Sequence, residues 1–162
     1  MKTVGIIGAG LMGKGIAKNL QSAGYSVTAH KRKIDENDPR VKELRDNNIK
    51  IESDLNSIFT ENEILITCLP TSEIIEDVLI GENGLYNSNN AAVKTVLDFS
   101  TARPESTKRI YGKLKEKNIS LLDTPMSGGP AQAEEGALKL FVGGDEEVFK
   151  SVKDILSVVS AS

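Results

Sequence analysis

Thr3-Val4-Gly5-Ile6-Ile7-Gly8-Ala9-Gly10-Leu11-Met12-Gly13-Lys14 is the stretch that decides the fold. Its apolar first part predicts a strand, which passes directly into a G-x-G-x-x-G pattern and then into a helical sequence. Gly8 permits a tight turn, Gly10 lets the backbone approach a pyrophosphate, and Gly13 lets the helix pack against the strand. The free N–H groups at the amino end of the helix would face the phosphates. The residues predicted to bind a dinucleotide here are Gly8, Ala9, Gly10, Leu11, Met12 and Gly13; the alternative is a glycine-rich turn that binds nothing.

Outward from this turn, short apolar runs rich in β-branched residues alternate with helical patterns along the whole chain. The runs at 3–7, 25–29, 64–69, 95–99, 119–122 and 138–142 predict strands. Helices are expected to begin at Asp38-Pro39, Thr71-Ser72-Glu73 and Arg103-Pro104-Glu105, and residues 145–159 predict an amphipathic helix. This alternation predicts an α/β fold: a doubly wound parallel sheet of the Rossmann type, covered on both faces in three α-β-α layers.

The end of the second predicted strand indicates which dinucleotide binds. An NAD site usually has Asp or Glu there, about 20 residues beyond the glycines, to accept hydrogen bonds from the ribose. This chain has His30-Lys31-Arg32-Lys33 instead. A guanidinium grips a 2′-phosphate with two parallel hydrogen bonds, so we expect Arg32, assisted by Lys31 or Lys33, to select NADP, with NAD as the second choice. The alternative is that these cations are solvated and that Asp35 or Glu36 reaches the ribose.

Composition excludes several other classes of protein. The 162 residues fit a single domain, and no apolar run approaches the length of a membrane span. A net charge of -3 argues against a nucleic-acid partner, because phosphate binding needs a surplus of Lys and Arg. Cys68 is the only cysteine, so neither an internal disulfide nor an all-cysteine metal site can form. We therefore expect no metal and no membrane partner. We also expect a cytoplasmic location, since the amino terminus does not resemble a signal peptide.

Four motifs follow one another along the chain: residues 5–13, Cys68-Leu69-Pro70, Asp98-Phe99-Ser100-Thr101-Ala102-Arg103-Pro104 and Asp123-Thr124-Pro125-Met126-Ser127-Gly128-Gly129-Pro130. In this order and spacing they resemble one known family, the β-hydroxyacid dehydrogenases, which includes the 3-hydroxyisobutyrate dehydrogenases and semialdehyde reductases. 6-Phosphogluconate dehydrogenase is a more distant relative. The resemblance covers essentially the whole chain, and Pro130 favours the small-substrate branch over the sugar phosphates.

The resemblance also implies roles for individual residues. Leu69 and Pro70 would line the cofactor and Thr101 would lie beside the nicotinamide. Ser127, Gly128 and Gly129 would hold a small acidic substrate, since glycines beside a serine leave backbone N–H groups free to meet a carboxylate. From composition alone, Ser-Gly-Gly-Pro is as typical of a plain turn.

Hydride transfer to or from a hydroxyl carbon also needs a proton donor or acceptor. In the family this is a lysine in a G-x-x-x-K-x-x-N pattern, which residues 1–162 do not contain. Lys14, Lys18 and Lys139 are expected on solvated helix faces or strand edges. We therefore expect the dinucleotide-binding domain of a longer enzyme, inactive and monomeric without the family's helical catalytic and dimerisation domain, whereas the full-length enzyme would be a homo-oligomer. A non-catalytic NADP-binding sensor module and a 6-phosphogluconate dehydrogenase-like enzyme are the alternatives.

Overall fold

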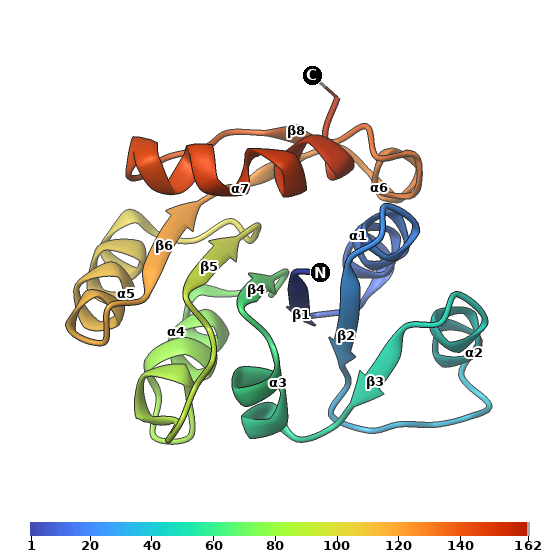
Figure 1. Cartoon of the computed structure of the whole chain (residues 1–162), viewed down its shortest axis with the longest axis horizontal. Coiled ribbons are helices and arrows are strands. Elements are labelled where there is room, and N and C mark those ends of the chain that lie inside the picture. Colours follow the sequence, from blue (N-terminus) through green and yellow to red (C-terminus); the bar gives the residue numbers. More distant parts are fainter. Residues whose placement is uncertain (162) are drawn as a thin grey trace.

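The computed structural model describes residues 1–161, and its middle layer is a six-stranded sheet (Figure 1). The strands lie in the order β3-β2-β1-β4-β5-β6, and every neighbouring pair is parallel. This is the doubly wound order of the Rossmann fold, so the predicted fold class is confirmed. The strands are β1 (Thr3–Ile7), β2 (Ser26–His30), β3 (Lys50–Glu52), β4 (Ile64–Thr67), β5 (Thr95–Asp98) and β6 (Ser120–Asp123).

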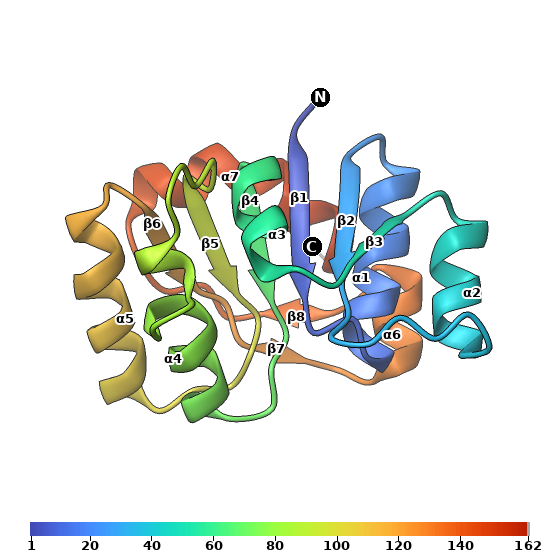
Figure 2. The ribbon, with the colours of Figure 1, turned by 90° about the horizontal axis from the view of Figure 1, so that it is seen from below.

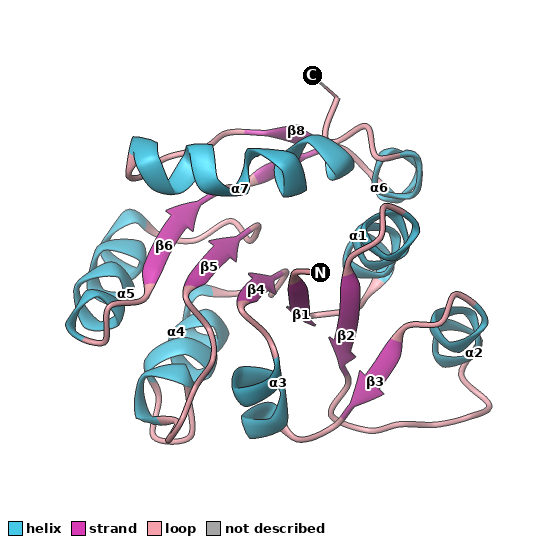
Figure 3. Ribbon diagram, viewed as in Figure 1, coloured by secondary structure: helices cyan, strands magenta, loops and turns pink. Residues whose placement is uncertain are grey.

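Helices cover both faces of the sheet, as Figures 1 and 3 show. One face packs against α1 (Leu11–Ser22), α2 (Pro39–Asp46) and α7 (Glu146–Val159), with α6 (Pro130–Glu135) beside α1. The other face packs against α3 (Leu55–Glu61), α4 (Ser72–Ile80), the 3-10 helix η1 (Leu85–Asn87) and α5 (Pro104–Glu116). The three-layer arrangement follows from strands that are apolar on both faces.

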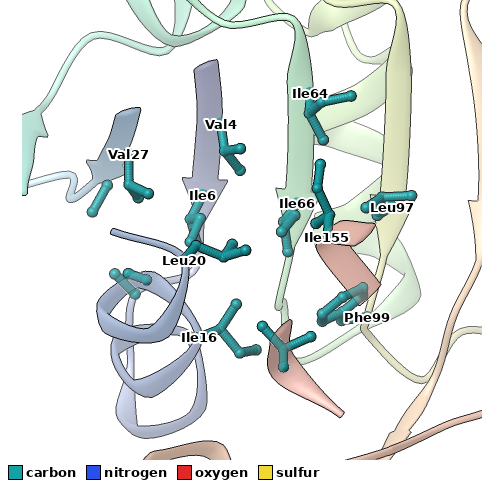
Figure 4. Close-up of a cluster of buried hydrophobic side chains, with 14 of the residues drawn as sticks. Val4, Ile6, Ile16, Leu20, Val27, Ile64, Ile66, Leu97, Phe99 and Ile155 are labelled. Carbon is teal, nitrogen blue, oxygen red and sulfur yellow. The ribbon is translucent and has the colours of Figure 1, made fainter. Parts of the chain in front are cut away.

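Alternate side chains of each central strand enter different cores. Val4 and Ile6 of β1 pack in one buried cluster with Ile16 and Leu20 of α1 (Figure 4). Ile7 belongs to the cluster on the opposite face. Because both faces are covered, the central strands appear in the sequence as continuous apolar runs.

The four predicted helix starts are confirmed by their first turns. The Asp38 side chain accepts a hydrogen bond from the backbone N–H of Arg40, and Thr71 caps α4 in the same way. Pro104 occupies the first turn of α5, and Asp145 caps α7. The capping side chains accept hydrogen bonds from backbone N–H groups that have no partner within the helix, and proline has no N–H to satisfy. Among the helices of residues 1–161, none is both long and apolar enough to cross a membrane.

The prediction of a strand over 138–142 was wrong in extent and in partner. Only β8 (Lys139–Leu140) forms there, and it pairs antiparallel with β7 (Met126–Ser127) outside the main sheet. A further parallel strand would need a long crossover, usually a helix that covers the sheet. Between β7 and β8 the chain has only the short α6, which lies against α1, so the chain turns back on itself instead.

Candidate functional site

A groove of about 1740 Å³ opens where the chain changes direction between β1 and β4. Parallel sheets bind ligands at this switch point, beyond the carboxyl ends of the strands. Figure 2 shows those ends, with the β7–β8 pair beneath them. The groove exceeds the roughly 300–1,000 Å³ typical of drug-sized pockets and has room for a dinucleotide. Of the residues predicted from the sequence, it is lined by Gly8, Ala9, Gly10, Leu11, Met12, Gly13, Lys31, Arg32, Lys33, Leu69, Pro70, Thr101 and Gly128.

The turn between β1 and α1 has room for glycine alone at two positions. Gly8 has φ +99°, and a Cβ there would lie 2.1 Å from the carbonyl oxygen of Cys68. A Cβ on Gly13 would lie 2.2 Å from the carbonyl oxygen of Gly8. Gly10 differs, because a Cβ there would meet no atom within 4 Å, so the space beside it is open groove. Gly8 and Gly13 therefore allow the turn to form, and Gly10 leaves its backbone accessible from the groove.

The amino end of α1 faces this open space without a side-chain cap. Gly10 is the N-cap residue and makes no side-chain hydrogen bond, and the first turn has no acidic residue. The first N–H groups of a helix have no partner within it and carry partial positive charge. The turn can therefore donate backbone hydrogen bonds to a diphosphate.

Cations surround the groove at the end of β2. Lys31 is largely covered and donates to Asp38, with Nζ 3.1 Å from Oδ2. Arg32 and Lys33 are exposed on the groove, and neither makes a salt bridge among the described residues. Of the three predicted phosphate readers, Arg32 and Lys33 are thus free to bind an anion, whereas Lys31 already has a carboxylate partner.

The acidic residue that pairs with the cations at this end of the groove is Asp38, which the sequence indicated only as a helix cap. The two acids considered earlier are held elsewhere: Glu36 pairs with Arg45 at 2.6 Å, and Asp35 accepts the backbone N–H of Asn37. Neither lines the groove. Hydrogen bonds from Arg40, and then from Lys31, hold the pKa of Asp38 well below its usual value, so it is a carboxylate at neutral pH.

His30, the last residue of β2, is buried and lies 3.2 Å from the carbonyl oxygen of Ser53 through Nε2. Burial lowers the pKa of this imidazole from its usual 6.5. It is therefore neutral at pH 7 and fixes the loop after β3 rather than supplying charge to the groove.

Hydrogen bonds, most of them buried, join the loop predicted to line the cofactor to the loop predicted to lie beside the nicotinamide. The backbone N–H of Leu69 donates to Oγ of Ser100 at 2.9 Å, and the Ser100 hydroxyl donates in turn to the Thr67 carbonyl. Asp98 accepts from the Thr67 hydroxyl at 2.8 Å and from the Ser100 N–H at 3.0 Å. Burial raises the pKa of Asp98, and these hydrogen bonds oppose the rise. The network ties the Leu69-Pro70 loop to the loop that carries Thr101.

The predicted substrate loop reaches the groove only in part. Gly128 lines it, with φ +138°, whereas Ser127 is exposed on β7 and pairs with Lys139 of β8. The N–H of Gly129 donates to Oε1 of Gln132 at 2.9 Å, so this amide is not free. Its partner is an exposed side chain, which a carboxylate ligand would have to displace.

Two lysines expected on solvated helix faces have ion-pair partners instead. Lys14 and Lys18 of α1 each lie 2.6 Å from Glu43 of α2, and both also pair with Glu134 of α6. These contacts raise the pKa of both lysines, mainly through Glu43 for Lys14 and Glu134 for Lys18. Lys139 is exposed on β8, as expected. Lys14 and Lys18 therefore join α1 to α2 and α6, and neither of them lines the groove.

The wall of the groove between α3 and α4 was not predicted from the sequence. Asn56 at the start of α3 accepts a hydrogen bond from the Ser88 hydroxyl at 2.8 Å, which closes this side. The signal that could have revealed the wall is the Asp54 cap of α3, where Asp54 accepts two backbone N–H groups. Within residues 1–161, no group of His, Cys, Asp and Glu could hold a metal ion. The missed lining residues include Ser53, Asp54, Leu55, Asn56, Ile74, Asp77, Val78, Glu82, Asn83, Gly84, Asn87, Ser88 and Asn89.

Comparisons with known proteins show the family to which this domain belongs. Residues 3–162 match the family model described as the NAD binding domain of 6-phosphogluconate dehydrogenase. The chain belongs to this family. Among its relatives, 2-hydroxy-3-oxopropionate reductase of Escherichia coli is 34% identical over 156 residues, which are 96% of this chain and 51% of that protein. The "probable 3-hydroxyisobutyrate dehydrogenase, mitochondrial" of Dictyostelium discoideum is 32% identical over 96% of this chain and 47% of its own length.

These relatives confirm the resemblance to the β-hydroxyacid dehydrogenases, and the chain is a nicotinamide-dinucleotide-binding domain of that type. It spans about half the length of the curated relatives it matches.

Solved structures share the fold. 3-Hydroxyisobutyrate dehydrogenase from Salmonella typhimurium has a TM-score of 0.86 at 24% identity, with 100% of this chain and 55% of that chain covered. Psf3 in complex with NADP+ has a TM-score of 0.83 at 23% identity over 98% of this chain and 55% of its own. An imine reductase variant from Myxococcus stipitatus, bound to NAD+, has a TM-score of 0.83 at 16% identity, with 99% of this chain and 53% of that chain covered.

Proposed function

We propose that this chain is the NADP-binding domain of an enzyme that transfers a hydride between NADP(H) and a small β-hydroxyacid or the corresponding semialdehyde. The observation that carries the coenzyme preference is Arg32. It lines the groove at the end of β2, where an NAD site would present a carboxylate, and it makes no salt bridge within residues 1–161. Among solved proteins of the same fold, one complex contains NADP+ and another contains NAD+, so the fold itself accommodates both coenzymes.

The residues present fit a nicotinamide dinucleotide along the whole groove. The amides of the glycine turn would hold the diphosphate, and Arg32 with Lys33 would hold the 2′-phosphate. Leu69, Pro70 and Thr101 would border the nicotinamide, which supplies or accepts the hydride when bound. A substrate carboxylate would meet Gly128 and, once Gln132 moves aside, the N–H of Gly129.

The coenzyme assignment is tested by titrating the protein with NADPH and NADH. NADPH should bind more tightly, and Arg32→Ala should remove most of the difference, because a charge-assisted hydrogen bond contributes about 1.5–3 kcal/mol. Arg45→Ala is the control, since Arg45 is an exposed arginine held by Glu36 away from the groove. Equal affinities of the unmodified protein for the two coenzymes would defeat the assignment.

Catalysis needs a proton donor that the reactive end of the groove does not supply. Leu69, Thr101 and Gly128 themselves carry no proton donor suited to this role, and the lysines, histidine and acids that line the groove come from the end of β2 and the loop after it, from Asp54, and from α4 and the loop after it. Burial raises the pKa of the nearby Cys68 thiol to about 12, which makes it a poor proton donor at neutral pH. We therefore propose that the 162 residues alone do not turn over acidic semialdehydes with NADPH. A robust rate of NADPH oxidation would show that a donor within them has been overlooked.

A further inference from the structure

One carboxylate lies inside the cation cluster at the end of β2. Oδ2 of Asp38 accepts from Lys31 Nζ and from Arg40 NH2, both at 3.1 Å. Oδ1 accepts from the backbone N–H and from Nε of Arg40, at 2.9 and 3.2 Å. Asp38, Lys31 and Arg40 all line the groove, together with Arg32 and Lys33. Four cationic side chains thus line the groove here, and the Asp38 carboxylate forms ion pairs with two of them, Lys31 and Arg40.

We propose that Asp38 and Arg40 set the strength of coenzyme selection: Asp38 competes with the 2′-phosphate for Lys31 and Arg40, and Arg40 is a second guanidinium available to that phosphate. The inference rests on the proposed placement of the 2′-phosphate at the end of β2. It adds two residues that the glycine turn and the Lys31-Arg32-Lys33 run do not include.

Lys31 and Arg40 differ in how much of the side chain is exposed, and therefore in how freely each can move toward a phosphate. The Lys31 side chain is 13% exposed and is held in place, whereas that of Arg40 is 49% exposed and has room to swing. A phosphate that arrives beside Arg32 repels the Asp38 carboxylate and attracts Arg40. Arg40 can then leave the side chain of Asp38 while its backbone N–H keeps the α2 cap intact.

Asp38 is poorly placed to serve as an NAD-type ribose ligand. Both of its oxygens already accept two hydrogen bonds each, from Arg40 and Lys31. A ribose hydroxyl would have to displace one of these charge-assisted bonds, which are stronger than a neutral one. The carboxylate is therefore a counter-ion of the cluster and not a reader of the sugar.

Asp38→Asn tests this directly, because asparagine caps a helix as well as aspartate does. The variant should bind NADPH about tenfold more tightly, equivalent to about 1.4 kcal/mol, with its affinity for NADH unchanged. Arg40→Gln should weaken NADPH binding by roughly tenfold and leave NADH unaffected, and in the Asp38→Asn background it should cancel part of the gain. Asp145→Asn, which replaces the cap of α7 away from the groove, should change neither affinity.

The outcomes separate this inference from the proposed function. If the unmodified protein binds both coenzymes equally but Asp38→Asn gains affinity for NADPH alone, the proposed preference fails and the counter-ion role stands. If the protein prefers NADPH but Asp38→Asn leaves its affinity unchanged or weakens it, the counter-ion role is overturned alone. Weaker binding of NADH by Asp38→Asn would identify Asp38 as a ribose ligand and would also overturn the inference. Thermal unfolding of each variant verifies that it is folded.

Discussion

Replacing Gly10 by alanine should separate coenzyme binding from folding. A Cβ at this position meets no atom within 4 Å, and the φ of −77° is open to any residue, so the fold can accommodate the methyl group. The remaining cost is that of alanine at a helix N-cap, which is about 1 kcal/mol. The free energy of unfolding, measured by urea titration, should therefore fall by no more than this amount.

Binding should respond far more strongly. The added methyl group would stand in the open groove beside the amino end of α1, where the diphosphate must approach the backbone. Loss of one charge-assisted hydrogen bond, about 1.5–3 kcal/mol, corresponds to roughly a 12- to 150-fold rise in Kd for both coenzymes. Calorimetric titration measures this. Gly112→Ala on α5, where a Cβ also meets nothing within 4 Å, should not alter Kd. Unchanged coenzyme binding by Gly10→Ala would refute the placement of the diphosphate.

Two further predictions concern stability. Gly13→Ala should lower the free energy of unfolding by about 3 kcal/mol, because the alanine Cβ would lie 2.2 Å from the Gly8 carbonyl oxygen and α1 would have to shift. The melting temperature should fall by roughly 6–12 °C. An unchanged melting temperature would contradict the close packing of the turn. His30 has a pKa lowered by burial, so the unfolded chain binds a proton more readily and stability should decline as the pH falls below 6.5. Urea unfolding at pH 7.5 and 5.5 measures this decline, which His30→Gln should reduce; an equal decline in both proteins would count against the buried neutral imidazole.

The sequence predicted the centre of the fold because local and global signals agree there. From Val4 to Ile7 the first strand is apolar and buried, and the turn and helix that follow have their glycines at the required spacing. β3 gave no such signal, because it is a three-residue edge strand in which only Ile51 is buried between Lys50 and Glu52. A strand this short, with polar neighbours on both sides, has no apolar run to reveal it. The 138–142 run had the composition of a strand, but its partner was fixed by the short α6 before it.

For the candidate site, sequence predicted which residues gather but not how their side chains pair. The run Lys31-Arg32-Lys33 reaches the groove as expected, yet the carboxylate beside it comes from Asp38 and not from Asp35 or Glu36. Loop conformation decides this, and the sequence pattern does not encode it. Likewise, Gly-Gly composition predicted free amides near Ser127, whereas Gln132 occupies the Gly129 amide through a side-chain contact three residues away.

The central claim is that the backbone amides at the start of α1 receive the coenzyme's diphosphate. Amide chemical shifts of the isotopically labelled protein during NADPH titration test it most directly. We predict that the largest changes fall on Gly10, Leu11, Met12 and Gly13, with saturation at one equivalent. Saturable binding that leaves these four amides unshifted, and moves others instead, would contradict the account.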